Sequence, residues 1–372
     1  MSSSRVLESI TTSPFAIHPL SSGQRPETAR EHIARSLPEL AQLERLLAKA
    51  PDGVNSRIEA SVALSDELHL PIYSISLGTR DPHAPLLLLS AGLHGIERIG
   101  SEVLLGFLAG LFERMQWDQA ITTLLEKLHI VVLPIVNPGG MLLRTRANPN
   151  GIDLNRNAPI DVEPGQHKRI FWPTGGQRLG AFLPWYRGRK SSPMELENRV
   201  LQAVVRRAVS GRPVAISLDI HSGFGCRDRI WIPYAYRRRP IACLPEMKAL
   251  ADLWAGSNPH HNYQFEPQSN HYLAHGDVWD YLHNQLEQEL LFLPLTLELG
   301  SWNWLRKRPR QLFNRLGLFH PLVPHRLKRA VRDHQSLLQF LMSAVASCEA
   351  WLPATDDRES LREAAIELWY QE

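Results

Sequence analysis

Short apolar runs alternate with amphipathic stretches along most of this chain of 372 residues. Apolar runs of about four to eight residues between turn residues are typical of strands buried on both faces of a sheet. This pattern predicts strands at 86–91, 128–135, 214–220, 229–234 and 291–299. Residues 57–64 and 72–77 alternate between apolar and polar side chains, which predicts two further strands with one face more exposed.

Between these strands, apolar residues recur at helical spacing. They predict helices at 38–50, 99–112, 195–209, 244–256, 277–289, 326–350 and 358–370. Strands that alternate with helices favour the α/β class. We therefore expect one domain with a twisted, mixed and mostly parallel β-sheet, covered by helices on both faces.

The ends of the chain differ from this central pattern. Residues 1–30 are rich in Ser, Thr and Pro without clear periodicity, which predicts an irregular arm. We place the catalytic domain at 31–350 and a helical tail at 351–372. The stretch from 144 to 185 holds many Asn, Gly, Pro and aromatic residues, and a loop of that length is typical of a functional segment.

Composition narrows the class of protein. The chain is 44% hydrophobic and 21% charged, with a net charge of +3, which fits a globular protein and gives no reason to expect nucleic acid as a partner. We interpret the basic clusters Arg237–Arg239 and Arg306–Arg308 as solvated faces. The three cysteines are far apart, and no apolar run has the length of a membrane span. We expect a cytoplasmic protein without a membrane partner.

Polar residues capable of chemistry follow the ends of the predicted strands. His94 and Glu97 come directly after the strand at 86–91, and His221 comes at the end of the strand at 214–220. In open α/β sheets, ligands bind at the carboxyl ends of the strands. Two His and one carboxylate form the ligand set of a hydrolytic zinc site with an open position. The sequence thus indicates a catalytic metal centre at this edge.

Four segments, taken together and in order, resemble the zinc carboxypeptidase family of the carboxypeptidase A type. They are His94–Glu97, Gly151–Asn157, Asp219–Gly223 and Leu297–Leu299, and Ser192–Glu197 is similar as well. The resemblance covers residues 38 to 315 approximately. It implies the family's α/β fold and its zinc-dependent hydrolysis.

The resemblance also implies roles for residues at the metal. His94, Glu97 and His221 would bind one Zn²⁺ per chain. Glu298 would be the general base that takes a proton from the attacking water and passes it to the leaving amine. Asp153 would accept a hydrogen bond from His94 and fix the tautomer of its ring.

Further matches imply substrate contacts. Arg146 would stabilise the oxyanion of the attacked carbonyl, with Arg144 as an alternative on the same short stretch. Asn155 and Arg156 would hold the terminal carboxylate of the substrate, for which a guanidinium fork is suited.

Two departures from the family concern the substrate. Digestive members carry an arginine immediately before the zinc-binding Glu, whereas this chain has Ile96. The mobile tyrosine that closes over the substrate has no certain match, so Tyr272 is the first candidate and Tyr281 the second. The histidines at 260, 261, 271 and 275 fall in a polar region that could rim the cleft.

These residues favour a metallocarboxypeptidase that removes the C-terminal residue of a peptide or of a peptide-like, for instance cell-wall-derived, substrate. An alternative is a zinc-dependent deacylase of N-acyl amino acids, of the aspartoacylase or succinylglutamate desuccinylase kind. Both would act on a small substrate with a free carboxylate. An alternative from another class is a zinc-binding protein without hydrolytic activity.

Overall fold

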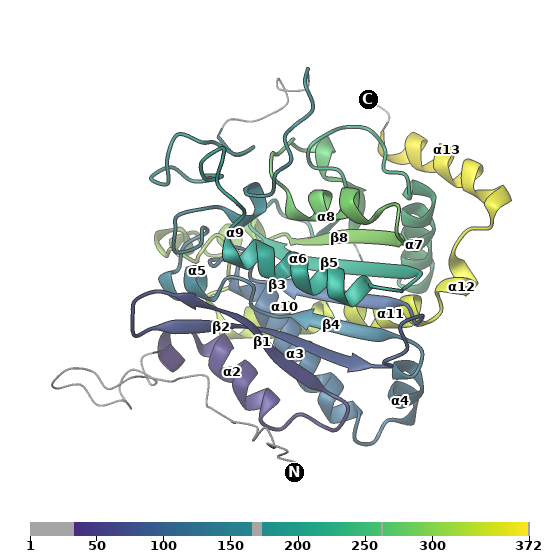
Figure 1. Ribbon diagram of the computed structural model, residues 1–372, viewed down its shortest axis with the longest axis horizontal. Helices are drawn as coiled ribbons and strands as arrows, with labels where there is room; N and C mark the ends of the chain where they lie inside the picture. The colour runs from purple at the N-terminus through teal and green to yellow at the C-terminus, as the bar shows by residue number, and fades with distance from the viewer. Residues whose placement is uncertain (1–32, 166–172, 262, 371–372) are drawn as a thin grey trace, which may run out of the picture.

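The computed structural model describes residues 33–165, 173–261 and 263–370, so the predicted N-terminal arm lies outside the described residues. One sheet of eight strands crosses the molecule in the order β1-β2-β4-β3-β5-β8-β6-β7 (Figure 1). The strands are β1 Asn55–Ala63, β2 His69–Gly78, β3 Leu86–Ala91, β4 His129–Leu133, β5 Val214–Ser222, β6 Arg229–Ile232, β7 Gln264–Pro267 and β8 Leu291–Leu299.

The centre of the sheet is parallel, and antiparallel pairs join it to the strands on either side. Strands β4, β3, β5 and β8 run parallel to one another, whereas β2 pairs antiparallel with β4 and β6 pairs antiparallel with β8. The edge strand β7 pairs parallel with β6. The predicted mixed, mostly parallel α/β sheet is confirmed. Because the four central strands share a direction, their carboxyl ends meet at one edge.

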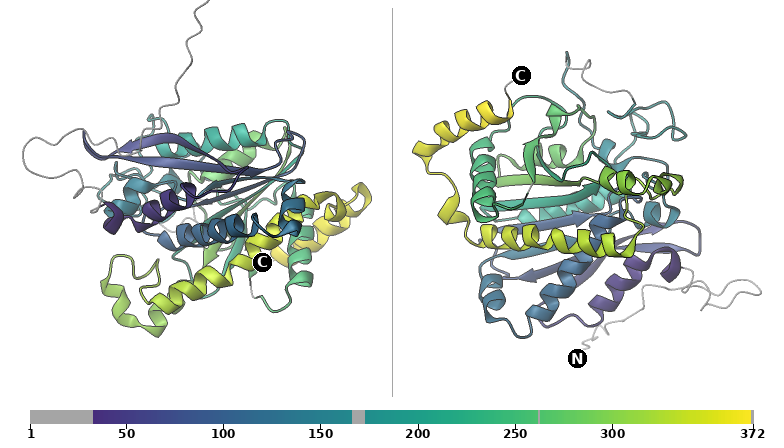
Figure 2. Two further views of the ribbon diagram at one scale, coloured as in Figure 1. Left: turned by 90° about the horizontal axis from the view of Figure 1, so that it is seen from below. Right: turned by 180° about the vertical axis from the view of Figure 1, so that it is seen from behind.

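Helices cover both faces of the sheet (Figures 1 and 2). Helices α2 Pro38–Leu47, α3 Arg98–Arg114, α7 Leu244–Ser257 and α11 Gln335–Ala346 pack on one face, and α6 Leu196–Val209 and α8 Val278–Leu286 pack on the other. Successive side chains of β3 enter different cores: Leu87 and Leu89 lie in the first, Leu86 and Leu88 in the second. A strand between two cores is apolar at most positions, which is why Leu86–Leu89 form a continuous apolar run.

Several elements differ from those predicted. The Asn137–Gly140 turn is the start of helix α5 Pro138–Leu143, because Asn137 Oδ1 accepts a hydrogen bond from the Gly140 amide at 2.8 Å and caps the helix. The helix predicted over 326–350 is three helices, α10 Pro324–Asp333, α11 and α12 Cys348–Trp351. The first break falls at His334, whose Nδ1 lies 2.5 Å from the Tyr263 hydroxyl.

Three elements were not predicted. They are α4 Gln119–Leu125, β7 and α9 Trp302–Lys307. Strand β7 contains four residues at the edge of the sheet, and α9 contains six residues, none of them buried. Elements this short carry too little periodicity for a pattern to be recognised.

The C-terminal helix α13 Arg358–Trp369 confirms the helix predicted at 358–370 and packs against α7. Arg358 forms an ion pair with buried Glu246, and Asn270 Nδ2 donates to the Trp369 carbonyl at 2.8 Å. Ala365 and Trp369 are buried in the first core. Within the described residues, every helix is too short or too polar to cross a bilayer.

Candidate active site

The carboxyl ends of β3, β5 and β8 bring the predicted site residues together. His94 and Glu97 lie in the loop between β3 and α3, and His221 lies near the end of β5. Gly95 allows this loop to press on α5, since a Cβ at that position would overlap the backbone of Gly140. Glu298 of β8 is the register partner of His221, so both side chains leave the sheet side by side.

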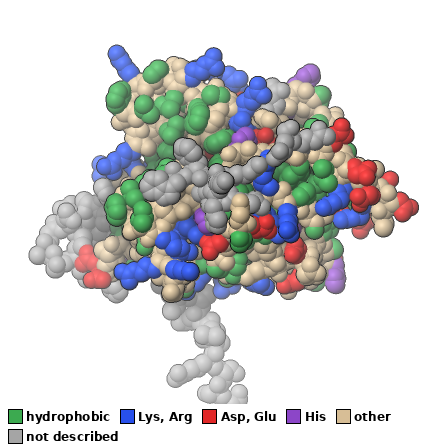
Figure 3. All heavy atoms as spheres, turned by 90° about the horizontal axis from the view of Figure 1, so that it is seen from above, with side chains coloured by type: hydrophobic (Ala, Val, Ile, Leu, Met, Phe, Trp, Pro, Cys, Tyr) green, Lys and Arg blue, Asp and Glu red, His purple; other side chains and the backbone are tan. Residues whose placement is uncertain are grey.

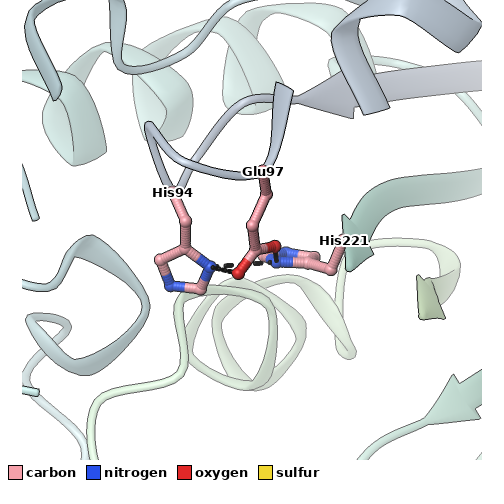
Figure 4. A group of neighbouring side chains, drawn as sticks. All are labelled: His94, Glu97 and His221. Atoms are coloured by element: carbon pink, nitrogen blue, oxygen red, sulfur yellow. Dashed lines mark hydrogen bonds and ion pairs between the residues drawn. The ribbon is translucent and has the colours of Figure 1, made fainter. Parts of the chain in front are cut away.

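His94, Glu97 and His221 form a compact cluster whose side chains point toward one another (Figure 4). Their potential ligand atoms all lie within 4.8 Å of one another, and all three residues are buried. His94 Nδ1 lies 2.9 Å from Glu97 Oε1, and His221 Nδ1 lies 3.0 Å from Glu97 Oε2. Among the described residues, this is the one group of His, Cys, Asp or Glu placed to hold a metal ion.

The outer nitrogens of both imidazoles face carboxylates. His94 Nε2 lies 3.1 Å from Asp153 Oδ1, and His221 Nε2 lies 2.6 Å from Asp219 Oδ2. A carboxylate in this position fixes the proton on Nε2 and turns the Nδ1 lone pair inward. The two Nδ1 atoms are 3.2 Å apart and both face the Glu97 carboxylate.

A metal cation between these lone pairs and the Glu97 carboxylate would stabilise their convergence, and two imidazoles with one carboxylate suit zinc. Without a cation, burial lowers the pKa of His221, but Asp219 outweighs it and the pKa lies well above its usual value. Metal binding would therefore displace a proton from the cluster. The donor set fits the zinc ion that the sequence predicts.

Asp219 is a residue that the sequence analysis left without a role. Its Oδ1 accepts from Ser90 Oγ at 2.7 Å, and its Oδ2 accepts from Trp279 Nε1 at 2.9 Å. The spacing contained the signal, because residues two apart on a strand point to the same face, and Asp219 stands two before His221.

The Asp219→Asn variant is expected to bind zinc roughly 10- to 100-fold more weakly, because the amide no longer fixes the His221 tautomer. Competition with a chelator of known affinity measures this change. Ser90→Ala is the matched control: it removes one hydrogen bond to Asp219, keeps the carboxylate on His221, and should change zinc affinity much less. Unchanged affinity in Asp219→Asn would contradict the role given to this carboxylate.

Arg146 joins the metal cluster to the substrate side. Its Nη1 lies 3.0 Å from Glu97 Oε1, and its Nε lies 2.8 Å from Asp153 Oδ2. Burial would raise the pKa of Asp153, but Arg146 and His94 outweigh it and hold that pKa well below the usual range. Burial would likewise raise the pKa of Glu97, but His94 and His221 lower it. Both carboxylates therefore stay charged.

Glu298 lies in a different environment. It is 6% exposed, and its Oε1 accepts from the Phe224 amide at 2.9 Å. Burial and the neighbouring Glu97 raise the pKa of Glu298 to about 8. A divalent cation beside it would favour the charged form and lower this pKa. A carboxylate that stands next to the cluster without belonging to it has the position of a base rather than of a ligand.

The cluster opens into a cavity of about 490 Å3. Asn155 and Arg156 line it, and so do Thr174 and Trp185 of the long loop. Arg156 is 2% exposed; its Nη1 donates to the Asn155 carbonyl at 2.7 Å and its Nε to the Thr174 carbonyl at 3.0 Å. These two bonds fix the plane of the guanidinium. Among the described cavity residues, Arg146 and Arg156 are the only arginines.

Neighbouring loops hold Arg156 from behind. Gly276 approaches it so closely that a Cβ there would overlap the Arg156 carbonyl, and the φ of Gly276 is +72°. Arg187 Nε donates to the same carbonyl at 2.9 Å. Arg98 stands two residues after Ile96, but it does not line the described cavity. Its Nη2 pairs instead with Glu39 Oε2 at 2.5 Å.

Three predicted substrate residues occupy different places. Tyr272 lines the cavity, with its ring centroid 5.9 Å from the Arg156 guanidinium carbon. Tyr281 packs on the second core and does not line the described cavity. Arg144 is exposed at the end of α5, where its φ of 55° turns the chain, and it also lies outside the described cavity lining. The structure therefore gives Arg144 no place at the site, because the α5 cap directs it to solvent.

Aromatic residues form much of the remaining wall, and apart from His271, which was expected at the rim of the cleft, the sequence did not single them out. Phe224 packs edge-on against Trp231, at 5.2 Å between ring centroids, and against His271 at 5.1 Å. Trp302 and Phe319 also line the cavity. No local motif marks them, since their shared position depends on loops far apart in sequence.

Comparison with known families decides the identity of this fold and site. The family model described as zinc carboxypeptidase matches residues 66–305, a range that includes all three cluster residues, Arg146 and Glu298. The chain belongs to the zinc carboxypeptidase family. The resemblance inferred from its motifs is confirmed.

Individual relatives are distant. The chain is 30% identical over 310 residues to Carboxypeptidase D of Mus musculus, covering 79% of this chain and 20% of that protein. It is 29% identical over 97 residues to Carboxypeptidase SOL1 of Arabidopsis thaliana, covering 25% of this chain and 20% of that protein. The chain thus matches about a fifth of the length of these curated relatives.

Solved structures show the same fold at low identity. A thrombin activatable fibrinolysis inhibitor aligns with a TM-score of 0.62 and 19% identity, over 82% of this chain and 72% of the other. Carboxypeptidase A from Helicoverpa armigera aligns with a TM-score of 0.61 and 20% identity, over 82% and 71%.

Proposed function

We propose that this protein is a zinc-dependent metallocarboxypeptidase that hydrolyses the C-terminal amide bond of a peptide or peptide-like substrate. One observation carries the proposal: the two-His, one-carboxylate cluster shares its cavity with the separate carboxylate Glu298 and the two arginines Arg146 and Arg156. We propose one Zn²⁺ per chain, because the described residues contain one such cluster.

A zinc ion held by the cluster would act as a Lewis acid and make water a stronger nucleophile near neutral pH. Glu298 accepts a proton from the attacking water and later donates it to the leaving amine. Arg146 presents its guanidinium beside Glu97, where it stabilises negative charge that develops on the attacked carbonyl oxygen. Each residue therefore serves one step of amide hydrolysis.

Arg156 makes the proposed enzyme an exopeptidase. Its guanidinium is fixed by two carbonyls yet lines the cavity, so it is positioned to bind a terminal carboxylate at low conformational cost. Asn155 and Tyr272 line the same cavity and are proposed to complete this carboxylate site. A peptide whose C-terminus is blocked would lose these contacts.

The family match favours a peptidase over a deacylase of N-acyl amino acids, and Glu298 and Arg146 argue against a silent zinc-binding protein, which needs neither. A direct experiment uses protein of measured zinc content. It compares the turnover of N-terminally blocked dipeptides and tripeptides with a free C-terminus, including cell-wall peptides, with the turnover of N-acyl amino acids. We expect turnover of peptides with a free C-terminus to exceed that of N-acyl amino acids. Preference for N-acyl amino acids would support the deacylase, and inactivity toward both would support the binding protein. Cytoplasmic location stays a prediction.

A further inference from the structure

The segment from 301 to 332 has an unusual charge composition. It contains nine Lys or Arg residues and no Asp or Glu, although the whole chain has a net charge of only +3. The nine are Arg306, Lys307, Arg308, Arg310, Arg315, Arg326, Lys328, Arg329 and Arg332. The rest of the chain is therefore net acidic, so this positive charge is concentrated locally.

The first part of this segment projects from the molecule. Residues 302–315, here named the basic turn, comprise α9 and the short 3-10 helix η4 Pro309–Phe313. In the left view of Figure 2 the yellow-green chain of this region extends from the body, on the side away from β1. All five basic side chains of the turn are exposed, and among the described residues none of them forms an ion pair.

The tip of the basic turn is apolar. Phe313 is 92% exposed and Leu312 is 63% exposed, whereas the preceding Gln311 is buried and donates to the Gly317 and His320 carbonyls at 2.7 and 3.0 Å. These bonds anchor the turn at Gln311, next to the two exposed apolar residues. Figure 3 shows hydrophobic side chains beside Lys and Arg side chains in its upper left part, where this region lies.

We propose that the basic turn binds the surface of an anionic phospholipid bilayer. An apolar tip enters the boundary between headgroups and acyl chains, while surrounding cations attract the anionic headgroups, and together these interactions give reversible binding. A soluble polyanion would account for the arginines but would leave Phe313 and Leu312 in water. A bilayer surface uses both features of the turn.

Two other possible binding partners of the basic turn, residues 1–32 and a second copy of the chain, fit its positive charge less well. Residues 1–32 contain three Arg and three Glu, so this stretch has no acidic surplus to match the turn. Residues 356–370 of a second copy hold five Asp or Glu against two Arg and would complement the charge, but joining opposite ends of identical chains generates open filaments unless the arrangement closes. A bilayer needs no such closure.

Bilayer binding would place the enzyme close to substrates at a membrane surface. Trp302 begins the basic turn and also lines the cavity, and its Nε1 donates to the Gly223 carbonyl at 2.8 Å. The turn and the cavity mouth are therefore adjacent. Such binding is peripheral and requires no spanning segment. It revises the interpretation of Arg306–Arg308 as a merely solvated face, and it does not depend on the proposed catalytic function.

Flotation of the full-length protein with vesicles tests the proposal. We expect binding to vesicles of phosphatidylcholine with phosphatidylglycerol, little binding to phosphatidylcholine alone, and weaker binding as salt is raised. The Arg308→Glu/Arg310→Glu variant should lower the partition coefficient about tenfold or more, because each basic residue near an anionic surface contributes strongly. Leu312→Ser/Phe313→Ser should also lower it about tenfold.

Arg57→Glu/Arg80→Glu is the matched control, since it makes the same charge change at two exposed positions, one in β1 and one two residues after β2. It should change vesicle binding by much less than the turn variants. Absent binding by the wild type, or equal losses in control and turn variants, would overturn the proposal. So would full retention of binding in Leu312→Ser/Phe313→Ser, which points to a soluble polyanion, or self-association without vesicles, which points to a second copy.

Discussion

The Glu298→Gln variant is expected to lose roughly two to four orders of magnitude in kcat and to retain its zinc. Glutamine keeps the size of the side chain and can still face the Phe224 amide, but its amide cannot accept a proton from water at neutral pH. Glu298 does not belong to the cluster of potential ligands, so the metal content should not change. Steady-state kinetics on a peptide substrate, together with metal analysis of the same sample, measures both quantities.

Glu197→Gln is a matched control for this change. Glu197 is also buried, at 2% exposure, but its carboxylate bonds to Asn148 and does not line the described cavity. Its replacement should leave kcat within a few-fold of the wild type. If Glu298→Gln behaved like this control, Glu298 would not be the base. If Glu298→Gln lost zinc, its loss of activity would not report on proton transfer.

The Arg156→Ala variant is expected to raise KM by roughly 30-fold or more for peptides with a free α-carboxylate, because a buried charged contact is lost. For amidated peptides, which lack the carboxylate, the change should be small. The ratio of kcat/KM between the two peptide forms, measured for wild type and variant, isolates the carboxylate contact from any general loss of structure.

Two further variants sharpen this test. Arg156→Lys retains the charge but lacks the planar fork, so it should recover only part of the preference for free carboxylates. Arg144 lies near this region of the chain, but its side chain is exposed to solvent. Arg144→Ala should therefore leave the preference for free carboxylates unchanged. Equal effects of Arg156→Ala on free and amidated peptides would exclude Arg156 as the carboxylate anchor.

Much of the fold could be predicted because the central strands are buried on both faces. The run at 86–91 matches β3 residue for residue, and 291–299 matches β8. Continuous apolar runs of this kind reflect two cores rather than one. The break at His334 could not be predicted, since it coincides with a contact to Tyr263, which is far away in sequence.

The metal cluster was predictable for a related reason: each ligand stands at or shortly after the end of a recognisable strand, and parallel strands end at one edge. The environment of those ligands was less predictable. Arg146 reaches both Glu97 and Asp153, and Trp279 reaches Asp219, through contacts between separate segments. Arg144 and Arg146 could not be distinguished in the sequence. The αL residue that ends α5 sends the first to solvent, whereas the second enters the cavity.

Removal of a single terminal residue distinguishes a carboxypeptidase from the other candidate functions. Zinc-loaded protein is incubated with a peptide that has a free C-terminus and, separately, with the amidated form of the same peptide. The masses of the peptides after incubation are measured by mass spectrometry. We expect the free peptide to lose one C-terminal residue at a time, the amidated peptide to stay intact, and the Glu298→Gln variant to leave both peptides intact. Internal cleavage, or no cleavage by protein that holds one zinc per chain, would exclude the proposed carboxypeptidase activity.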